Sequence, residues 1–598
     1  LLIIAGAGTG KTTVITERIK NLIFSKKAKP SEILALTFTE KAAREMEERV
    51  DLALPYGYTQ MWISTFHSFC DRVLRDQALH IGLDPKYRLM TEANTVQLIR
   101  NNLFKFDLDY FRPLGNPTKF VRGMIQHFSR LQDEDVSPSE YLAWAKTRNP
   151  KSEIRNKDEK IEIQKWLELA NAYKKYEEIK IQEGVMDFGD LIVKTLKLFR
   201  DRPNVLKEYK NQFKYILVDE FQDTNISQYE LIKLLAPPRN NPNLSVVGDD
   251  SQSIYKFRGA AVSNILSFKK DYKKAKTVVL IKNYRSTQII LDAAYRLVQH
   301  NNPDTLETQL GISKNLKSNA GDKKETDVFF IHSDRVENEA DQVAKEILRL
   351  IAQDRYKYRD FAILVRANNH SEPFARALSR HGIPYQFLGP GRLFKQPEVI
   401  DLISYLKVLY NFEDSVAFCR LLSIDYLNIS SRDLAAIGNF ARRFNLSLFE
   451  ACDPPSSFGE LRTTQGQGAL PFVSSDTREK IQKILEIIHK HLSLIKKETA
   501  GQLLYYFLEN SGLIQKLLSP DTPQAEKRAL NISKFFDKLK TYEVDHEDAT
   551  VSAVVDWIEL SSDLGESPLA ADIDWTNINA VNILTVHSSK GLEFPVVF

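Results

Sequence analysis

A glycine-rich loop near the start of the chain joins an apolar strand to a helix. Residues 2–5 predict a buried strand, and the sequence from Lys11 onward predicts a helix. The junction matches a phosphate-binding loop, with alanine in place of its first glycine, over Ala5, Gly6, Ala7, Gly8, Thr9, Gly10, Lys11, Thr12 and Thr13. Glycines let backbone N–H groups surround phosphates, while Lys11 can reach the terminal phosphates and Thr12 can bind Mg²⁺. The loop alone predicts nucleoside triphosphate binding, which kinases, GTPases and transporters share.

Short strands and helices alternate after this loop. A strand is expected at residues 33–38 and a helix at 41–50, which is typical of a parallel sheet with crossover helices. The strand pattern fades over residues 85–198, where long amphipathic segments predict helices. Strands return at residues 215–218 and 244–247. We therefore expect an α/β unit that is interrupted by a helical insertion.

The second half of the chain repeats this organisation without repeating the sequence. Strands are expected at residues 277–280, 328–331 and 361–365, helices over 399–561, and another strand at 581–586. The predicted domains are 1–85 with 199–276, the insertion 86–198, 277–397 with 568–598, and the insertion 398–567.

Two adjacent carboxylic acids, Asp219 and Glu220, follow the apolar strand at 215–218. Asp219 at the strand end is suited to hold Mg²⁺, and Glu220 is suited to polarise an attacking water. Acid pairs on surfaces are common and inert, but a pair that directly follows a buried strand is unusual. Together with Lys11, the pair predicts hydrolysis of the nucleotide.

Composition excludes several other classes of protein. The 82 Lys and Arg residues and 78 Asp and Glu residues leave a net charge of only +4, so any nucleic-acid contact must come from local patches. No apolar run approaches the roughly 18 residues of a membrane span. The three cysteines, Cys70, Cys419 and Cys452, are scattered, which argues against a zinc ribbon, an iron–sulfur cluster or a disulfide framework.

Several further motifs occur in a fixed order. Residues 219–224 read Asp-Glu-Phe-Gln-Asp-Thr, and the chain as a whole resembles superfamily one DNA helicases of the UvrD, PcrA and Rep type. Segments similar to motifs Ia, Ib, III, IV and V of that family lie at residues 37–43, 64–69, 247–259, 283–286 and 585–594. The resemblance implies an α/β fold of two RecA-like P-loop NTPase lobes, each with a mostly helical insertion.

The resemblance also assigns roles around one ATP and its Mg²⁺. Gln252 would sense the γ-phosphate, and Arg285, arriving from the second α/β unit, would act as an arginine finger. Tyr284 would stack on the adenine, and Glu593 would accept a hydrogen bond from the ribose. Lys11, Asp219 and Glu220 complete the catalytic set, with Thr12 and Asp219 as metal ligands.

Candidate DNA contacts lie in the same motifs. Phe66, His67, Tyr255 and Phe257 are candidate stacking platforms for bases, and Thr37, Thr39 and Arg258 are candidate phosphate contacts. Two further candidates are Thr65 and His587, although a structural histidine is an equal alternative for the latter. Phe38 and Phe69 are expected in the core. The expected partners are single-stranded DNA, junctions of single and double strands, and repair or recombination proteins.

By family analogy, the activity is ATP-dependent travel on single-stranded DNA, in the 3′ to 5′ direction, coupled to unwinding in repair, replication restart or recombination. The expected location is the cytoplasm, at the nucleoid. One alternative is the motor of a RecB- or AddA-like helicase–nuclease, and another is a DNA-bound ATP switch that displaces proteins without unwinding. A P-loop kinase or GTPase is disfavoured by the Gln-Asp-Thr extension and by Gln252.

Both ends of the sequence are expected to be interior to a longer chain. Leu1 begins inside a strand pattern, and Phe598 closes the apolar run 595–598. The adenine-reading glutamine motif would precede Leu1, and motif VI, with its second arginine, would follow Phe598.

Overall fold

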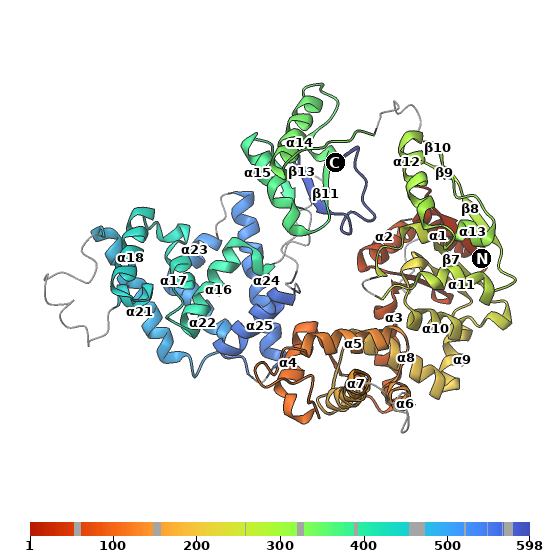
Figure 1. Cartoon of the computed structure of the whole chain (residues 1–598), viewed down its shortest axis with the longest axis horizontal. Coiled ribbons are helices and arrows are strands. Elements are labelled where there is room, and N and C mark those ends of the chain that lie inside the picture. The colour runs from red at the N-terminus through yellow and green to blue at the C-terminus, as the bar shows by residue number, and fades with distance from the viewer. Residues whose placement is uncertain are drawn as a thin grey trace. The chain divides into compact units, whose positions relative to one another are not determined.

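The computed structural model divides the chain into two compact units, Leu1–Phe330 and Ile331–Phe598 (Figure 1). It describes residues 1–52, 61–147, 157–256, 259–319, 328–387, 393–453, 473–518, 522–546, 548–564, 566, 568 and 578–598. Each unit combines a parallel sheet with a helical part. The α/β fold class with parallel sheets in two lobes is therefore confirmed.

A six-stranded sheet forms the centre of unit 1. Its strands are β1 (Leu2–Ala5), β2 (Ile33–Thr37), β3 (Trp62–Thr65), β6 (Tyr215–Val218), β7 (Leu244–Gly248) and β8 (Thr277–Leu280). Their order is β3-β2-β6-β7-β1-β8, and all neighbouring pairs are parallel. The carboxyl ends of these strands therefore share one edge, which is where the phosphate-binding loop leaves β1.

Helices cover both faces of this sheet because its strands are apolar on both sides. On one face, Ile3 and Ala5 pack with α1 (Lys11–Phe24) and α2 (Glu40–Asp51). On the other face, Leu2 and Ile4 belong to a core that includes Leu306 of α13 (Leu306–Leu310) and residues of five further helices. These helices are α3 (Phe66–Gln77), α8 (Phe188–Asp201), α9 (Pro203–Gln212), α10 (Ile226–Leu235) and α11 (Val262–Asp271).

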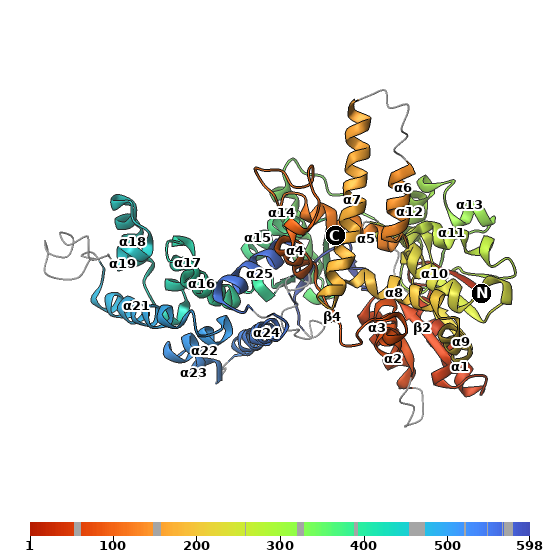
Figure 2. The same ribbon diagram turned by 90° about the horizontal axis from the view of Figure 1, so that it is seen from below.

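The helical part of unit 1 lies between α3 and α8 in the sequence. Its helices are α4 (Glu92–Asn101), α5 (Val121–Asp133), α6 (Pro138–Thr147) and α7 (Lys157–Gln182). The short parallel strands β4 (Arg88–Leu89) and β5 (Val185–Met186) pair where the chain enters and leaves this part. Helices α6 and α7 lie side by side (Figure 2).

Two expectations for the second α/β unit are corrected, although the strand at 277–280 is present as predicted. Residues 277–280 form β8, which pairs with β1 in the sheet of unit 1, from Leu2 opposite Thr277 to Ala5 opposite Leu280. An apolar run predicts a strand but does not identify its partner. Residues 328–331 form no strand: residues 328–330 are exposed, and Ile331 packs against the apolar cluster of unit 2.

After β8, unit 1 continues with the parallel pair β9 (Lys282–Asn283) and β10 (Lys317–Ser318). Two helices lie between these strands in the sequence, α12 (Gln288–Val298) and α13 (Leu306–Leu310).

The sheet of unit 2 has the order β12-β13-β11-β14 and is also parallel. Its strands are β11 (Phe361–Val365), β12 (Tyr385–Phe387), β13 (Val581–Thr585) and β14 (Val596–Val597). Residues of α14 (Val336–Ile351) and α15 (Glu372–Arg380) pack against β11 and β13 in one apolar cluster.

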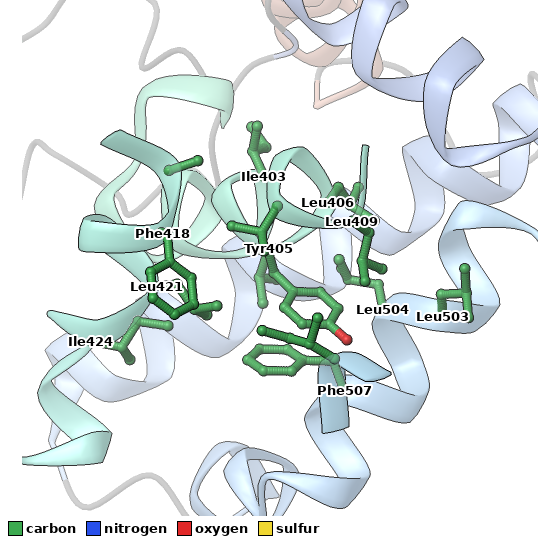
Figure 3. Packing of buried hydrophobic residues seen from close by; sticks show 14 of the residues in the cluster. Ile403, Tyr405, Leu406, Leu409, Phe418, Leu421, Ile424, Leu503, Leu504 and Phe507 are labelled. Carbon is green, nitrogen blue, oxygen red and sulfur yellow. The ribbon is translucent and has the colours of Figure 1, made fainter. Parts of the chain in front are cut away.

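The helical part of unit 2 has a core of its own. Its helices are α16 (Pro397–Tyr410), α17 (Ser415–Leu422), α18 (Ser431–Phe444), α19 (Leu448–Cys452), α21 (Ser475–Leu494), α22 (Ala500–Asn510), α23 (Leu513–Leu518), α24 (Pro523–Asp545) and α25 (Val551–Leu564). At its centre the ring of Tyr405 lies over that of Phe507, with ring centroids 3.9 Å apart (Figure 3).

Candidate nucleotide site

The glycine-rich loop turns from β1 into α1 through two left-handed residues. Gly8 has φ +76° and Gly10 has φ +87°, a region that favours glycine. A Cβ added to Gly8 would lie 2.7 Å from both the Asn283 Nδ2 atom and the Arg285 Cβ atom. The loop therefore needs glycine at position 8 for its backbone path and for this close approach.

The Lys11 ammonium lies between two groups from the ends of β6 and β7. Its Nζ atom donates to Glu220 Oε2 at 3.1 Å and to Gln252 Oε1 at 2.6 Å. Gln252 also donates from Nε2 to Asp249 Oδ2 at 2.7 Å. Three segments far apart in the sequence thus meet at one ammonium, which can exchange these partners for phosphate oxygens.

Thr12 and Asp219 form a pair suited to a divalent cation. Thr12 Oγ1 lies 3.5 Å from Asp219 Oδ2, and the Asp219 side chain is buried. Burial, together with the nearby Glu220 carboxylate, raises the pKa of Asp219 to about 7, although Lys11 opposes this shift. A cation would stabilise the ionised carboxylate, and one hydroxyl with one carboxylate leaves positions for water and phosphate oxygens, as Mg²⁺ prefers. These residues therefore fit Mg²⁺.

Glu220 lies at a strained turn directly after β6. It has φ +49°, a conformation that is costly for a residue other than glycine and that concentrates at functional sites. Gln222, whose role was not predicted, donates from Nε2 to Glu220 Oε2 at 2.5 Å and accepts at Oε1 from the Asp249 N–H at 3.0 Å. Gln222 thereby fixes the Glu220 carboxylate relative to the end of β7. The only sequence indication was its place in the run 219–224.

A second unpredicted residue, Lys314, neutralises the acids that follow β7. Its Nζ atom lies 2.6 Å from Asp249 Oδ1 and 2.5 Å from Asp250 Oδ1. Burial alone would raise the pKa of Asp249, but the Lys314 ammonium holds it below its usual value. No motif surrounds Lys314. The only sequence indication that a cation would be needed here was the pair Asp249 and Asp250, which follows an apolar strand.

The segment expected to bring an arginine from the second unit belongs instead to unit 1. Asn283 Nδ2 donates to the Ala7 carbonyl at 2.6 Å, and the Tyr284 N–H donates to the Gly8 carbonyl at 2.9 Å. The Tyr284 side chain is exposed beside the loop. Arg285 therefore begins next to the phosphate-binding loop, because it follows β9, which comes directly after β8 in unit 1.

The candidate DNA contacts of unit 1 divide into accessible and buried residues. Tyr255 is half-buried and stacks on Phe38, with ring centroids 5.1 Å apart and 22° between the ring planes. Thr39 is exposed and caps α2, accepting at Oγ1 from the Ala42 N–H at 3.2 Å. Phe257 and Arg258 lie outside the described residues.

The prediction for Phe66 was wrong, because its ring is buried in the core under the sheet and offers no face to a base. Phe69 is buried, as expected. Thr37 and Thr65 are also buried, so neither hydroxyl reaches a phosphate in this conformation. The Thr37 hydroxyl has no hydrogen-bond partner among the described residues.

The Thr65 hydroxyl is already engaged at the start of α3. It accepts from the Ser68 N–H at 3.2 Å and donates to Glu40 Oε1 at 2.8 Å. His67 meets the ring edge of Phe188, with ring centroids 6.1 Å apart, and burial lowers its pKa. A neutral imidazole can stack on a base but adds no charge for a phosphate.

Glu593 and His587 lie in unit 2, between β13 and β14. The Ser588 N–H donates to Thr585 Oγ1 at 3.2 Å, and Gly591 adopts φ +91°, so the segment begins with a capped turn. The roles of Glu593 toward ribose and of His587 toward DNA stay predictions.

Within the described part of the chain, no helix is both long and apolar enough to cross a bilayer. Over the same residues, no group of three or more His, Cys, Asp and Glu side chains is placed to hold a metal ion. The Thr12 and Asp219 pair is not such a group, since a threonine hydroxyl supplies one of its two oxygens.

Comparison with known proteins agrees with the motifs. A family model described as the UvrD/REP helicase N-terminal domain matches residues 1–273, and one described as the UvrD-like helicase C-terminal domain matches residues 278–598. The ATP-dependent DNA helicase PcrA of Staphylococcus aureus is 33% identical over 100% of this chain and 75% of the relative. PcrA of Bacillus subtilis is 32% identical over the same shares. The chain therefore belongs to the UvrD/REP family of helicases.

Proposed function

We propose that this chain is an ATP-driven DNA helicase that travels 3′ to 5′ on single-stranded DNA and separates strands at duplex junctions. The observation that carries the proposal is the position of Lys11 between Glu220 and Gln252. Relatives named as ATP-dependent DNA helicases support the activity. Repair, replication restart or recombination is the proposed setting, with proteins of those pathways as partners and the nucleoid as location.

Each side chain at the site has a proposed task. Lys11 would bind the terminal phosphates, Gln252 would report their presence to the DNA-contacting segment, and Glu220 would orient the water and take its proton. Thr12 and Asp219 would hold Mg²⁺, which when bound neutralises phosphate charge.

Tyr284, Arg285 and Glu593 have proposed tasks toward the rest of the nucleotide. Tyr284 would stack on adenine, and Arg285 would stabilise the charge that develops in the transition state. Glu593 would bind the ribose. The DNA track would include Thr39, His67 and Tyr255, with Phe257, Arg258 and His587 as its further candidates.

The test is ATP turnover with and without oligo-dT, for the unsubstituted protein, Lys11→Ala and Lys20→Ala. Lys20 lies on the same helix and pairs with Glu17 at 3.0 Å, so it is a matched control. We expect DNA to stimulate turnover, Lys11→Ala to lower it by about 100-fold or more, and Lys20→Ala to leave it nearly unchanged.

Duplexes with 3′ or 5′ single-stranded tails then test direction, and the 3′-tailed duplex should be unwound. Turnover that is indifferent to DNA would overturn the helicase proposal. DNA-stimulated turnover without strand separation would identify an ATP switch instead.

A further inference from the structure

The carboxyl end of α5 lies between two segments that carry candidate site residues. Asp133 is the last residue of this helix, and its Oδ1 atom accepts a hydrogen bond from Asn225 Nδ2 at 2.7 Å. Asn225 directly follows the run 219–224 and caps α10 by accepting from the Gln228 N–H at 2.8 Å. One oxygen of Asp133 is thus hydrogen-bonded to the segment that begins with Asp219 and Glu220.

The other oxygen of Asp133 lies against a turn beside the DNA candidates. A Cβ added to Gly259 would lie only 2.2 Å from Asp133 Oδ2. Gly259, at φ +87°, closes a turn by donating its N–H to the Lys256 carbonyl at 3.1 Å. Arg130, about one helical turn before Asp133, donates to the same Lys256 carbonyl at 3.4 Å. The end of α5 therefore contacts Lys256, which directly follows Tyr255, and Gly259.

The segment after Gly259 is also hydrogen-bonded directly to the segment that ends the run 219–224. The Ala261 N–H donates to the Thr224 carbonyl at 2.9 Å, and Asn264 Nδ2 donates to the Asn225 carbonyl at 2.8 Å. Gln132 anchors the end of α5 by donating to Asp187 Oδ1 at 3.1 Å and to Asp190 Oδ1 at 3.2 Å. The Asp133 carboxylate is thus a fixed bridge, because both it and its contacts are held by neighbouring bonds.

We propose that Asp133 is a positioning residue that transmits DNA contact near Lys256 and Gly259 to the run 219–224. A carboxylate is rigid, so displacement of Gly259 against Oδ2 moves Oδ1 and the Asn225 amide bound to it. That shift reaches Glu220 through a single short turn, in which the Asp223 N–H donates to the Glu220 carbonyl at 2.9 Å. The inference rests on the proposed function, since it requires DNA to bind near Tyr255.

The sharpest test first breaks the Asp133–Asn225 hydrogen bond and then restores it with the opposite polarity. Asn225→Asp retains the oxygen that caps α10 but places a carboxylate against Asp133. We expect DNA-stimulated ATP turnover to fall about tenfold, the order of one lost hydrogen bond to a charged group, while turnover without DNA stays within about twofold. The double variant Asp133→Asn with Asn225→Asp restores an amide–carboxylate pair and should recover turnover to within about threefold.

Controls separate this inference from a general loss of folding or function. Glu134→Gln removes the adjacent exposed carboxylate and should leave DNA stimulation unchanged. Thermal melting of every variant shows whether it folds, and Asp133→Ala provides a second loss variant that introduces no repulsion.

Equal loss of turnover with and without DNA, or a double variant no better than Asn225→Asp, would overturn the positioning role. If the unsubstituted protein shows no DNA stimulation at all, the proposed function fails first, and that result is visible before any variant is compared.

Discussion

The two helical parts of the molecule are stabilised by different interactions. In unit 1, the fully buried Lys180 ammonium lies 2.6 Å from Asp190 Oδ2, 2.9 Å from Asp187 Oδ2 and 2.6 Å from Glu177 Oε1. In unit 2, the centre is the stacked pair of Tyr405 and Phe507 within a large apolar cluster. The first part is organised by charge and the second by apolar packing.

This difference affects how strictly the core of each helical part fixes the arrangement of its helices. Buried ion pairs contribute little net stability but strongly penalise wrong arrangements, because any unpaired charge is costly. The network in unit 1 joins α7 and α8 and, through Gln132, the end of α5, which contacts the segments at the nucleotide site. Apolar packing in unit 2 supplies stability but tolerates rearrangement more readily. The arrangement of helices in the helical part of unit 1 is therefore more tightly constrained than the arrangement in the helical part of unit 2.

The largest expected effect comes from removing the buried ammonium. Lys180→Met leaves three carboxylates without their shared partner and should lower the free energy of unfolding of unit 1 by about 3–5 kcal/mol. Hydrogen exchange followed by mass spectrometry should show faster exchange in α7 and α8 but not in α16 or α22. Lys175→Met is the matched control, because Lys175 pairs with Glu178 on the surface of the same helix. Stabilisation of unit 1 by Lys180→Met would contradict the role given to the charge network.

Phe507→Ala tests the apolar centre of unit 2 in the same way. Losing a fully buried ring should cost about 3–4 kcal/mol of unfolding free energy, through lost burial and the cavity left behind. Urea unfolding, read out by exchange in α16 and α22, measures the loss. Tyr505→Ala on the same helix removes an exposed ring and should cost less than about 1 kcal/mol. Similar losses for both variants would mean that the stacked pair is not the centre of this core.

Acid should destabilise unit 2 through a buried histidine. Burial lowers the pKa of His491 to about 4, and its ring nitrogens contact the Tyr405 hydroxyl at 2.5 Å and Asn510 Nδ2 at 3.1 Å. Since the folded pKa is depressed, the unfolded state takes up the proton first, and stability should fall as pH drops from about 6.5 to about 4. The expected loss is about 1–2 kcal/mol.

The measurement is urea unfolding of unit 2 at several pH values, with His491→Gln and His489→Gln. His489 is more exposed and pairs with Asp453 at 2.6 Å, so its replacement should leave the dependence on His491 intact. A pH profile that His491→Gln does not flatten would remove His491 as the cause.

Asp190→Asn should have the smallest effect. Burial and the adjacent Asp187 carboxylate raise the pKa of Asp190 to about 7, so an amide resembles the protonated form present near neutrality. Because the folded pKa lies above the unfolded one, the natural carboxyl loses stability as pH rises from about 4 to about 7. We therefore expect less than about 1 kcal/mol of destabilisation by Asp190→Asn at pH 7, and a less favourable comparison with the natural protein at pH 5. Chemical unfolding at the two pH values measures this. A loss near that of Lys180→Met would show that Asp190 is fully ionised in its ion pair.

The sequence predicted the elements that are encoded locally. The strand at 2–5, the loop, the helix from Lys11 and the acids after 215–218 all follow from short-range patterns, and each occurs where expected. Sheet partners were less predictable. The strand at 277–280 has an apolar pattern that fits either unit, and only its register with β1 assigns it to the first.

Buried polar partners were also hidden from the sequence. Lys314 and Lys180 look like surface lysines, because nothing adjacent to them in sequence reveals the carboxylates that meet them in space. Phe66 was misassigned for a related reason, since an aromatic residue at the start of a helix can face a base or the core, and the neighbouring packing decides.

The sheet order of unit 1 also constrains how the chain folds during synthesis. Strand β1 is made before both of its neighbours in the sheet, β7 and β8, which consist of residues 244–248 and 277–280. At a ribosomal rate of roughly 5–20 residues per second, the apolar segment of β1 waits for tens of seconds before its partners exist. The phosphate-binding loop, which β1 supports, therefore cannot reach its final form until residues 277–280 have emerged. Nascent chains stalled before residue 277 should leave this first strand open to chaperones.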